Sequence, residues 1–411
     1  MLNQKLILMS QKKIVAIFPI IFLVWFLLPL SCSNQKQSKQ SENNSDTLSL
    51  YPFKVNLPGL SQKKIKDLET KIQSFYQDNY TDFNGAFLVA KNGQILLEHY
   101  QGIANYKEKT KIDSNTPIHL ASVSKPLTAT AVLKLIADGK LQLQDKVQQY
   151  LPNFPYPETT IESLLNHRSG IPNYLKFAER DKKWNSKKVL RNEDVVNYMV
   201  QKKLPRVSNH NRTFAYNNSN YVVLALVIEM VTGKTFPQAM KEILFDPLGM
   251  EHAFVFDYFT QKEQVSGSYK SNYQMVPWDE YDALYGDKNI YATPRDLWKF
   301  HLSFYSDFLP DHLKELQFKG YSYEKKGVKN YGLGFRMNEW DQNTKITYHN
   351  GWWHGNTTSF VHMHQDTVVM IALSNKYSKK PYQTIKMSAI FGNYPYQLQL
   401  KKGETETLNI D

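Results

Sequence analysis

Apolar positions near the start of the globular part of the chain follow two different periods. Between residues 63 and 76 they recur at helical spacing, at Ile65, Leu68, Ile72 and Phe75. Between residues 85 and 100, two apolar runs flank Asn92-Gly93, the pair of residues typical of a type I′ turn between strands. The pattern therefore predicts a helix that packs on a sheet, followed by a β-hairpin.

The middle of the chain, from about residue 126 to 290, has mostly helical patterns separated by loops. Residues 221–231 form a nearly continuous apolar run that ends at Thr232-Gly233, as expected of a buried helix with a glycine after its last turn. Thr293 followed by Pro294 predicts a further helix start, with threonine as the N-cap and proline in the first helical position.

The last third of the chain returns to strand patterns. We expect strands at residues 331–336, 345–349, 357–364 and 367–374, with an amphipathic helix near 384–391 covering them. Early and late strands around a helical middle predict an α+β fold. Its single antiparallel sheet would have about five strands drawn from both chain ends, flanked by helices, with a mostly helical subdomain inserted.

The N-terminus carries an apolar run with the features of an export signal. Lys12-Lys13 precede residues 14–30, and the run ends in Ser31-Cys32. We expect residues 1–31 to be a lipoprotein signal peptide and Cys32 to be lipidated, which places the protein in the cell envelope, periplasmic or on the outer surface. An uncleaved transmembrane anchor is the alternative, although the run is short for a span and contains Pro19.

Composition indicates where the globular domain begins and ends and which partners suit the chain. Residues 32–58 begin with a polar stretch that cannot form a core and predict a flexible tether. The globular domain is expected at 59–399, and 400–411 is a polar tail. The 411 residues carry a formal net charge of +12, which suits an anionic partner. The export signal favours the envelope over nucleic acid, and with Cys32 as the one cysteine no disulfide can form within the chain.

Candidate chemistry begins at Ser122-Val123-Ser124-Lys125, at the start of an apolar helical run. Residues three apart share a helix face, so the Lys125 amine can reach the Ser122 hydroxyl. A serine hydroxyl becomes a good nucleophile when a neighbouring base takes its proton, and a desolvated lysine can do this. Taken alone, the motif also fits a serine N-cap with a solvated lysine.

Two further elements follow in order: Tyr216-Asn217-Asn218, just before the buried helix, and His349-Asn350-Gly351, at the end of a predicted strand. The order and spacing of the three elements resemble those of the class C β-lactamase, D,D-peptidase and esterase superfamily, whose elements are Ser-x-x-Lys, Tyr-x-Asn, and Lys-Thr-Gly or His-x-Gly. The resemblance extends over about residues 60–395 and includes Leu164 to Gly170, Pro247 to Met250, Ala292 to Leu297 and Tyr331 to Gly334.

The resemblance implies a role for each site residue. Ser122 would form an acyl-enzyme, with Lys125 and Tyr216 as the basic apparatus, and which of the two accepts the proton stays open. Asn218 would orient Lys125 and the substrate amide. His349 would assist proton traffic to or from Tyr216. The backbone N–H groups of Ser122 and Trp352 would hold the oxyanion.

The third element departs from the β-lactamase pattern. A histidine and an amide, His349 and Asn350, stand where lysine and threonine would grip the carboxylate of an antibiotic. Trp352 and Trp353 follow Gly351 and are expected to narrow the acyl pocket. This favours an esterase or D-amino-acid peptidase that acts on a small acyl ester, a peptide or a cell-wall fragment. A β-lactamase, a D,D-carboxypeptidase, a sensor acylated without turnover and an envelope scaffold are the alternatives.

The remaining histidines do not predict a metal site. His167 lies beside a helix end, where a structural hydrogen-bonding role is the expectation. His362 and His364 share one face of a predicted strand, but no acidic or cysteine residue accompanies them. The chemistry expected of Ser122 needs neither a metal nor another cofactor.

Overall fold

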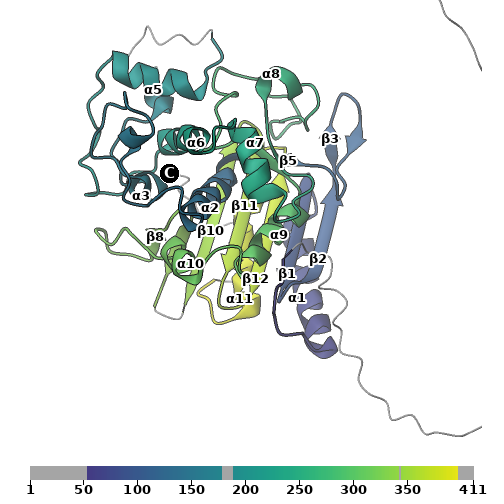
Figure 1. Cartoon of the computed structure of the whole chain (residues 1–411). Helices are drawn as coiled ribbons and strands as arrows, with labels where there is room; N and C mark the ends of the chain where they lie inside the picture. The colour runs from purple at the N-terminus through teal and green to yellow at the C-terminus, as the bar shows by residue number, and fades with distance from the viewer. Residues whose placement is uncertain (1–52, 178–187, 342–343, 397–411) are drawn as a thin grey trace, which may run out of the picture. The chain divides into compact units, whose positions relative to one another are not determined.

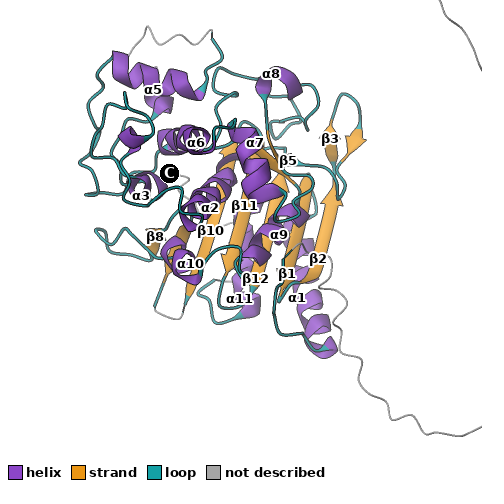
Figure 2. Ribbon diagram, viewed as in Figure 1, coloured by secondary structure: helices purple, strands orange, loops and turns teal. Residues whose placement is uncertain are grey.

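The fold is organised around a seven-stranded antiparallel sheet, in the order β2-β1-β12-β11-β10-β9-β8 (Figure 2). This computed structural model describes residues 53–177, 188–341 and 344–396, all within one compact unit. The expected signal peptide, the lipidation site Cys32 and the C-terminal tail lie outside the described residues. The strands are β1 (Gly85–Lys91), β2 (Gln94–Gln101), β8 (Lys329–Tyr331), β9 (Arg336–Glu339), β10 (Lys345–Trp353), β11 (Asn356–Met363) and β12 (Val368–Ser374).

Both chain ends contribute to the sheet, as predicted, because β1 pairs with β12 along its whole length. Two details of the strand prediction were wrong. Residues 331–336 do not form one strand: Gly332 and Gly334 lie in a turn that separates β8 from β9, and Gly334 has a φ of +89°, where glycine is favoured. The sheet has seven strands, where about five were expected. In addition, β10 continues to Trp353, so the third element lies inside a strand and not at its end.

The strands at the centre of the sheet are buried on both faces, since helices cover each side. In β1, Ala86 and Leu88 pack into the core shared with the helical subdomain, whereas Phe87 and Val89 pack into a second core against α1 (Gln62–Tyr80). This alternation is the two-residue period of a strand. The second core also receives the end of the 3₁₀ segment η6 (Lys380–Met387), which precedes α11 (Ser388–Phe391).

The opposite face carries the helical subdomain, which is green and teal in Figure 1. Its α-helices are α2 (Ser124–Ala137), α3 (Ile161–Leu165), α5 (Asn192–Gln201), α6 (Asn218–Thr232), α7 (Phe236–Met240), α8 (Tyr258–Gln261), α9 (Pro294–Ser303) and α10 (Asp311–Gln317). The predicted signals hold at α6, where Gly233 is left-handed, and at α9, where Thr293 is the N-cap and Pro294 follows. Its described residues also form the 3₁₀ turns η2 (Ala121–Val123), η3 (Val147–Gln149) and η4 (Tyr174–Lys176) and the π-turn η5 (Lys241–Phe245).

A small three-stranded sheet brings the nucleophile region beside a distant loop. It has the order β5-β7-β6, formed by β5 (Ile118–His119), β7 (Ile290–Ala292) and β6 (Phe254–Val255). A two-stranded sheet pairs β3 (Ile103–Asn105) with β4 (Thr110–Lys111). Within the described ranges, no helix taken singly has the length and apolarity to cross a membrane, and α6 with Phe236–Phe245 qualifies only as a pair bent by 79°.

Candidate active site

Ser122 lies in a strained turn at the start of α2. The preceding residue, Ala121, has a φ of +49°, a conformation that is uncommon for residues other than glycine. Its N–H donates to Nδ1 of His119 at 3.1 Å, so Nε2–H of His119 donates to Oδ1 of Asn289 at 2.9 Å. Burial lowers the pKa of His119 to about 4, which keeps the ring neutral and able to accept from Ala121. His119 therefore holds the turn that presents the nucleophile.

The predicted pairing of Ser122 with Lys125 is present in the structure. Lys125 is fully buried, and its Nζ donates to Ser122 Oγ at 3.2 Å and to the carbonyl oxygen of Asp287 at 2.8 Å. Ser122 itself is partly exposed, so a substrate can approach its hydroxyl. Two hydrogen bonds thus fix the lysine side chain with one partner on the nucleophile.

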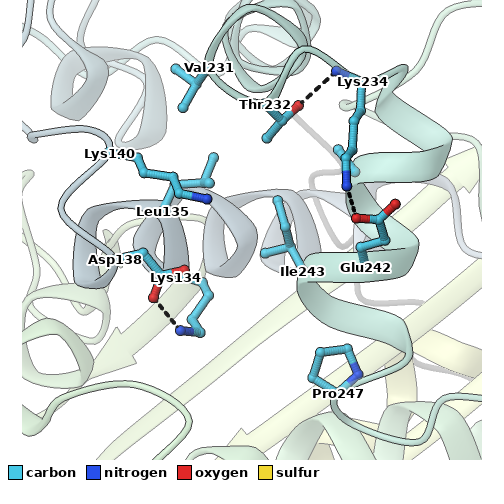
Figure 3. Close-up of a pocket in the computed structure, with 11 residues that line it drawn as sticks. Lys134, Leu135, Asp138, Lys140, Val231, Thr232, Lys234, Glu242, Ile243 and Pro247 are labelled. Atoms are coloured by element: carbon cyan, nitrogen blue, oxygen red, sulfur yellow. Dashed lines mark hydrogen bonds and ion pairs between the residues drawn. The ribbon is translucent and has the colours of Figure 1, made fainter.

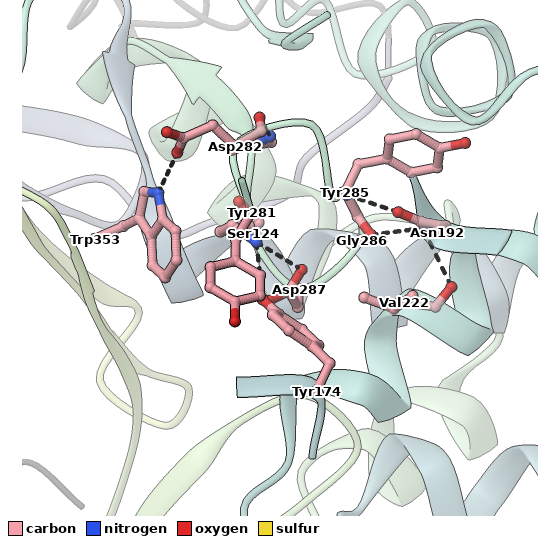
Figure 4. Close-up of polar contacts among 12 residues, drawn as sticks. Ser124, Tyr174, Asn192, Val222, Tyr281, Asp282, Tyr285, Gly286, Asp287 and Trp353 are labelled. Atoms are coloured by element: carbon pink, nitrogen blue, oxygen red, sulfur yellow. Dashed lines mark hydrogen bonds and ion pairs between the residues drawn. The ribbon is translucent and has the colours of Figure 1, made fainter. Parts of the chain in front are cut away.

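The loop that supplies the Asp287 carbonyl is held by buried polar contacts (Figure 4). Tyr174 donates to Oδ2 of Asp287 at 2.7 Å. Nζ of Lys288 donates to the Tyr174 hydroxyl at 2.8 Å and lies 3.6 Å from Oδ1 of Asp287. Burial lowers the pKa of Lys288, and the neighbouring Asp287 carboxylate opposes that shift. Lys288 is therefore a second buried lysine, not predicted from the sequence, that helps to hold the loop whose carbonyl binds Lys125.

Three side chains surround the ring of Tyr216. Lys125 Nζ lies 5.0 Å from the ring centre, the guanidinium carbon of Arg336 lies 4.7 Å from it, and the His167 ring centre lies 4.5 Å away. Both cations are within the range of cation–π contacts. Arg336 was not predicted as a site residue, because its side chain reaches the site only through the pairing of β9 with β10, where Arg336 stands opposite Tyr348.

His349 is buried, and both of its ring nitrogens have partners. Nδ1 lies 2.8 Å from the Asn350 carbonyl oxygen, and Nε2 lies 3.2 Å from the Tyr331 hydroxyl. Burial holds its pKa well below the usual range, with Arg336 and Lys125 adding to the shift. The imidazole is therefore neutral, as expected. Its contacts run to Tyr331, while the Tyr216 ring centre is 6.1 Å away.

His167 has contacts of the structural kind that the sequence analysis expected. It is fully buried, its Nδ1 accepts from the Asn217 backbone N–H at 3.2 Å, and its Nε2 lies 3.2 Å from the Tyr331 hydroxyl. Burial, followed by the charge of Lys125, holds the pKa of His167 well below the usual range.

Asn218 does not hold Lys125 through its carbonyl oxygen. Its Oδ1 is buried and has no hydrogen-bond partner among the described residues, whereas the lysine bonds to Asp287. The adjacent Asn217 serves the fold instead, since its Oδ1 accepts from the Ser219 N–H at 2.9 Å and caps α6. Asn218 thus leaves a buried acceptor without a donor at the start of the same helix.

Gly351 allows the third element to approach the nucleophile. A Cβ there would collide with the Thr358 side chain and with the carbonyl oxygen of Leu120, two residues before Ser122. Thr358 Oγ1 donates to that same carbonyl at 2.6 Å, which ties β11 to the nucleophile turn. The close packing explains why glycine stands at this position of β10.

The two tryptophans that follow diverge. Trp353 Nε1 donates to Asp282 at 2.6 Å, as Figure 4 shows, and its ring lies 4.5 Å from Lys288 Nζ. Trp352 is 56% exposed, and its ring contacts Tyr377 at 6.5 Å. The expectation that both indoles narrow one pocket is therefore wrong, because they face different surroundings.

Other features of the structure lie apart from this chemistry. In the described part of the chain, Asp279, Asp282 and His354 bring three potential metal-ligand atoms within 4.8 Å of one another. His354 Nε2 is 2.9 Å from Asp282, and Trp353 also donates to that carboxylate, so protein contacts already engage it. A cavity of about 300 Å³ lies between the C-terminal ends of α2 and α6, at the end of α2 opposite to Ser122 (Figure 3).

Comparison with known proteins agrees with this geometry. Residues 77–390 match the family model described as Beta-lactamase. The chain belongs to the Beta-lactamase family. A member of this family with an intact Ser122–Lys125 pair is a serine hydrolase of the β-lactamase-related type, which confirms that part of the prediction.

Relatives of this chain include proteins of Bacillus subtilis and Staphylococcus aureus. Penicillin-binding protein 4* of Bacillus subtilis (strain 168) is 30% identical over 373 residues, which are 86% of this chain and 81% of that protein. Teichoic acid D-alanine hydrolase of Staphylococcus aureus is 27% identical over 276 residues, 64% of this chain and 65% of that protein.

Solved structures confirm the predicted fold class. The penicillin-binding protein from Bacillus halodurans matches with a TM-score of 0.67 at 23% identity, covering 79% of this chain and 99% of that one. FmtA from Staphylococcus aureus matches with a TM-score of 0.63 at 23% identity, covering 85% and 96%. At these identities the structural likeness concerns the fold.

Proposed function

We propose that this protein is an envelope esterase or D-amino-acid peptidase that hydrolyses its substrate through an acyl-enzyme on Ser122. The observation that carries the proposal is the 3.2 Å contact between a fully buried Lys125 amine and a partly exposed Ser122 hydroxyl. A buried base beside an accessible hydroxyl is the arrangement that nucleophilic catalysis needs.

The reaction has two balanced halves. Ser122 Oγ bonds to the acyl carbon while its proton passes to the Lys125–Tyr216 pair, and the negative oxygen is held by the N–H groups of Ser122 and Trp352. The carbon–leaving-group bond then breaks, and the leaving alcohol or amine takes that proton. Water adds to the acyl-enzyme, gives up a proton to the same pair, and releases the acid with the Ser122 hydroxyl restored.

Two observations, one from the structure and one from a relative, support a substrate derived from a D-amino acid. Asn218 Oδ1, buried and without a donor among the described residues, could accept an N–H of the acyl group. The name of one relative, teichoic acid D-alanine hydrolase, points to D-alanine on a cell-wall polymer as a specific substrate of this kind. We therefore propose D-alanyl esters and short D-amino-acid peptides as the substrate class.

A second candidate, D,D-carboxypeptidase or β-lactamase activity, is favoured by Arg336. The lack of a lysine in His349-Asn350-Gly351 suggested that the site has no fixed charge for a carboxylate, but Arg336 places a guanidinium 4.7 Å from the Tyr216 ring centre. A charge-assisted hydrogen bond from such a group contributes roughly 1.5–3 kcal/mol. Because the two tryptophans also diverge, both grounds for a preference for esters over β-lactams are weakened, and that preference stays a prediction.

One experiment tests the acyl-enzyme and separates these candidates. Wild type and Ser122→Ala should be compared for fluorophosphonate labelling and for turnover of a p-nitrophenyl ester, a D-alanyl ester, a D-Ala-D-Ala peptide and nitrocefin. We expect labelling and turnover in the wild type alone, with specificity constants highest for the esters. Undiminished labelling of Ser122→Ala would place the nucleophile elsewhere, and nitrocefin turnover as fast as ester turnover would make β-lactamase the leading assignment.

We further propose that the protein is lipid-anchored through Cys32 in the cell envelope. The support is the apolar run before Ser31-Cys32 in the sequence. Cys32→Ala should abolish labelling by a lipid precursor, whereas an unchanged, uncleaved N-terminus would favour a transmembrane anchor.

A further inference from the structure

A continuous chain of hydrogen bonds joins the second and third elements of the site behind Tyr216. Its members are the Asn217 backbone N–H, His167, the Tyr331 hydroxyl, His349 and the Asn350 carbonyl oxygen, and we name it the His167–Tyr331–His349 relay. All four steps are 2.8–3.2 Å between heavy atoms. The three side chains are buried, with Tyr331 1% exposed and both histidines fully enclosed.

The two ends of the relay fix the direction of every proton in it. A backbone N–H can only donate, so Nδ1 of His167 accepts from Asn217 and Nε2 of that neutral ring carries the proton. A carbonyl can only accept, so Nδ1 of His349 carries the proton and its Nε2 accepts. The Tyr331 hydroxyl then accepts from His167 and shares its proton between His349 and the Tyr221 hydroxyl.

The charges around the two rings keep this arrangement in place. Lys125 of α2 and Arg336 of β9 face both rings and disfavour a further positive charge on either one. Tyr216 and Tyr221 also lie against the His167 ring, at 4.5 Å and 5.3 Å between ring centres. Tyr221 itself donates to the carbonyl oxygen of Leu165 at 2.8 Å. Tyr331 stays a phenol, because burial raises its pKa.

We propose that Tyr331 and His167 are positioning residues of this hydrolase, which hold the Nδ1–H tautomer of His349 in place through its Nε2 atom and hold the Tyr216 ring beside Lys125. In this arrangement the basic nitrogen of His349 is occupied by the Tyr331 hydroxyl. The histidine orients the third element, and proton transfer is left to Lys125 and Tyr216. This inference rests on the proposed acyl-enzyme on Ser122 and deepens it.

The decisive variant is Tyr331→Phe, because it removes the central hydroxyl and keeps the ring. We expect kcat for a p-nitrophenyl ester to fall about tenfold with little change in KM, the scale of one hydrogen bond lost from an aligned site. The freed Nε2 of His349 should titrate closer to the ordinary histidine range, which adds an acidic limb to the pH profile of kcat/KM. Nitrogen NMR of ¹⁵N-histidine-labelled full-length protein should show opposite tautomers for His167 and His349 in the wild type, and in Tyr331→Phe the Nε2 signal of each ring should shift because its hydrogen bond is lost.

Tyr80→Phe is the matched control, because it too removes one buried tyrosine hydroxyl. The Tyr80 hydroxyl lies on the opposite face of the sheet and donates to the carbonyl oxygen of Lys380 at 2.9 Å. It should leave the pH profile and the histidine signals unchanged. His167→Asn breaks the relay at its other end and suits the backbone there, whose φ of +58° asparagine tolerates. It should lower kcat without the acidic limb, because the Tyr331 hydroxyl still donates to Nε2 of His349.

The outcomes separate this inference from the acyl-enzyme proposal. A Tyr331→Phe profile that superimposes on the wild type, or wild-type histidines with the same tautomer, would overturn the relay while labelling of Ser122 continued. A wild type that does not react with a fluorophosphonate would overturn the acyl-enzyme and, with it, the positioning role.

Discussion

The two faces of the central sheet bury very different side chains. The face against α1 is almost entirely apolar, with aromatic contacts such as Phe87 to Tyr76 and Phe87 to Tyr80, whose ring centres lie 5.0 and 4.9 Å apart. The face against the helical subdomain encloses Lys125 and the His167–Tyr331–His349 relay beside its apolar core. Burial of polar groups costs free energy unless they are hydrogen-bonded. The second face is therefore expected to contribute less to stability, and its buried polar groups serve catalysis.

The largest effect should come from changing the catalytic face. Lys125→Met, which keeps the volume of the side chain, and Tyr216→Phe should each lower kcat/KM about 10²–10⁴-fold, since each removes part of the basic apparatus. Steady-state kinetics on an ester would measure this loss, and urea unfolding would check that the fold is retained. Activity within twofold of the wild type in either variant would remove that residue from the mechanism.

Changing the α1 face should have the converse effect. Phe87→Ala removes a fully buried ring and should lower the free energy of unfolding by about 3–5 kcal/mol. The folded fraction should keep the kcat of the wild type, because Phe87 packs in the core on the α1 side of the sheet, opposite to Lys125. The urea midpoint at unchanged m-value measures the first effect. A kcat loss comparable to that of Lys125→Met in folded protein would show that the two faces are coupled.

A smaller effect should come from acidification, which acts mainly on the catalytic face. Burial lowers the pKa of His119 from 6.5 to about 4, so the unfolded chain binds the extra proton first. The stability this neutral ring provides is complete above about pH 6.5 and is lost as the pH falls toward 4, by roughly 3 kcal/mol at about 1.4 kcal/mol per pKa unit. His301, lowered to about 3, acts in the same direction.

Unfolding free energies measured between pH 7 and 4 test this prediction, with His119→Gln as the comparison variant. Burial raises the pKa of Asp279 and Glu229, so these two groups oppose the trend near the lower end of the range. The variant should show a flatter pH dependence than the wild type. Equal slopes for both proteins would mean that His119 does not hold the nucleophile turn.

What could be predicted from the sequence was local or carried by the family pattern. The Ser122–Lys125 contact follows from three-residue spacing on one helix, and the hairpin at Asn92-Gly93 follows from turn chemistry. Tyr216 and His349 were identified because their motifs resemble those of the family. The split of residues 331–336 into two strands was missed, although Gly332 and Gly334 are the breakers that cause it.

Residues that reach the site through tertiary pairing gave no such signal. Asp287 bonds to Lys125 across 162 positions, and its contribution is a backbone carbonyl, which no side-chain pattern reveals. Arg336 reaches the site only in the observed register of β9 against β10. A slip of one residue in that register would move its side chain to the other face of the sheet. The role of His119 could not be predicted either, because it depends on the positive φ of Ala121.

The pairing of β1 with β12 also constrains how the chain can fold. Ser374 Oγ donates to the Asn84 carbonyl, 290 residues away, and the whole register from Gly85 to Lys91 depends on equally distant partners. Contacts of such high sequence separation form slowly, because a very long loop must close first. Until the last strand of the sheet has been synthesised, β1 has an open edge that can pair with other chains. A chain that stops before Val368 should therefore aggregate instead of forming a smaller stable domain.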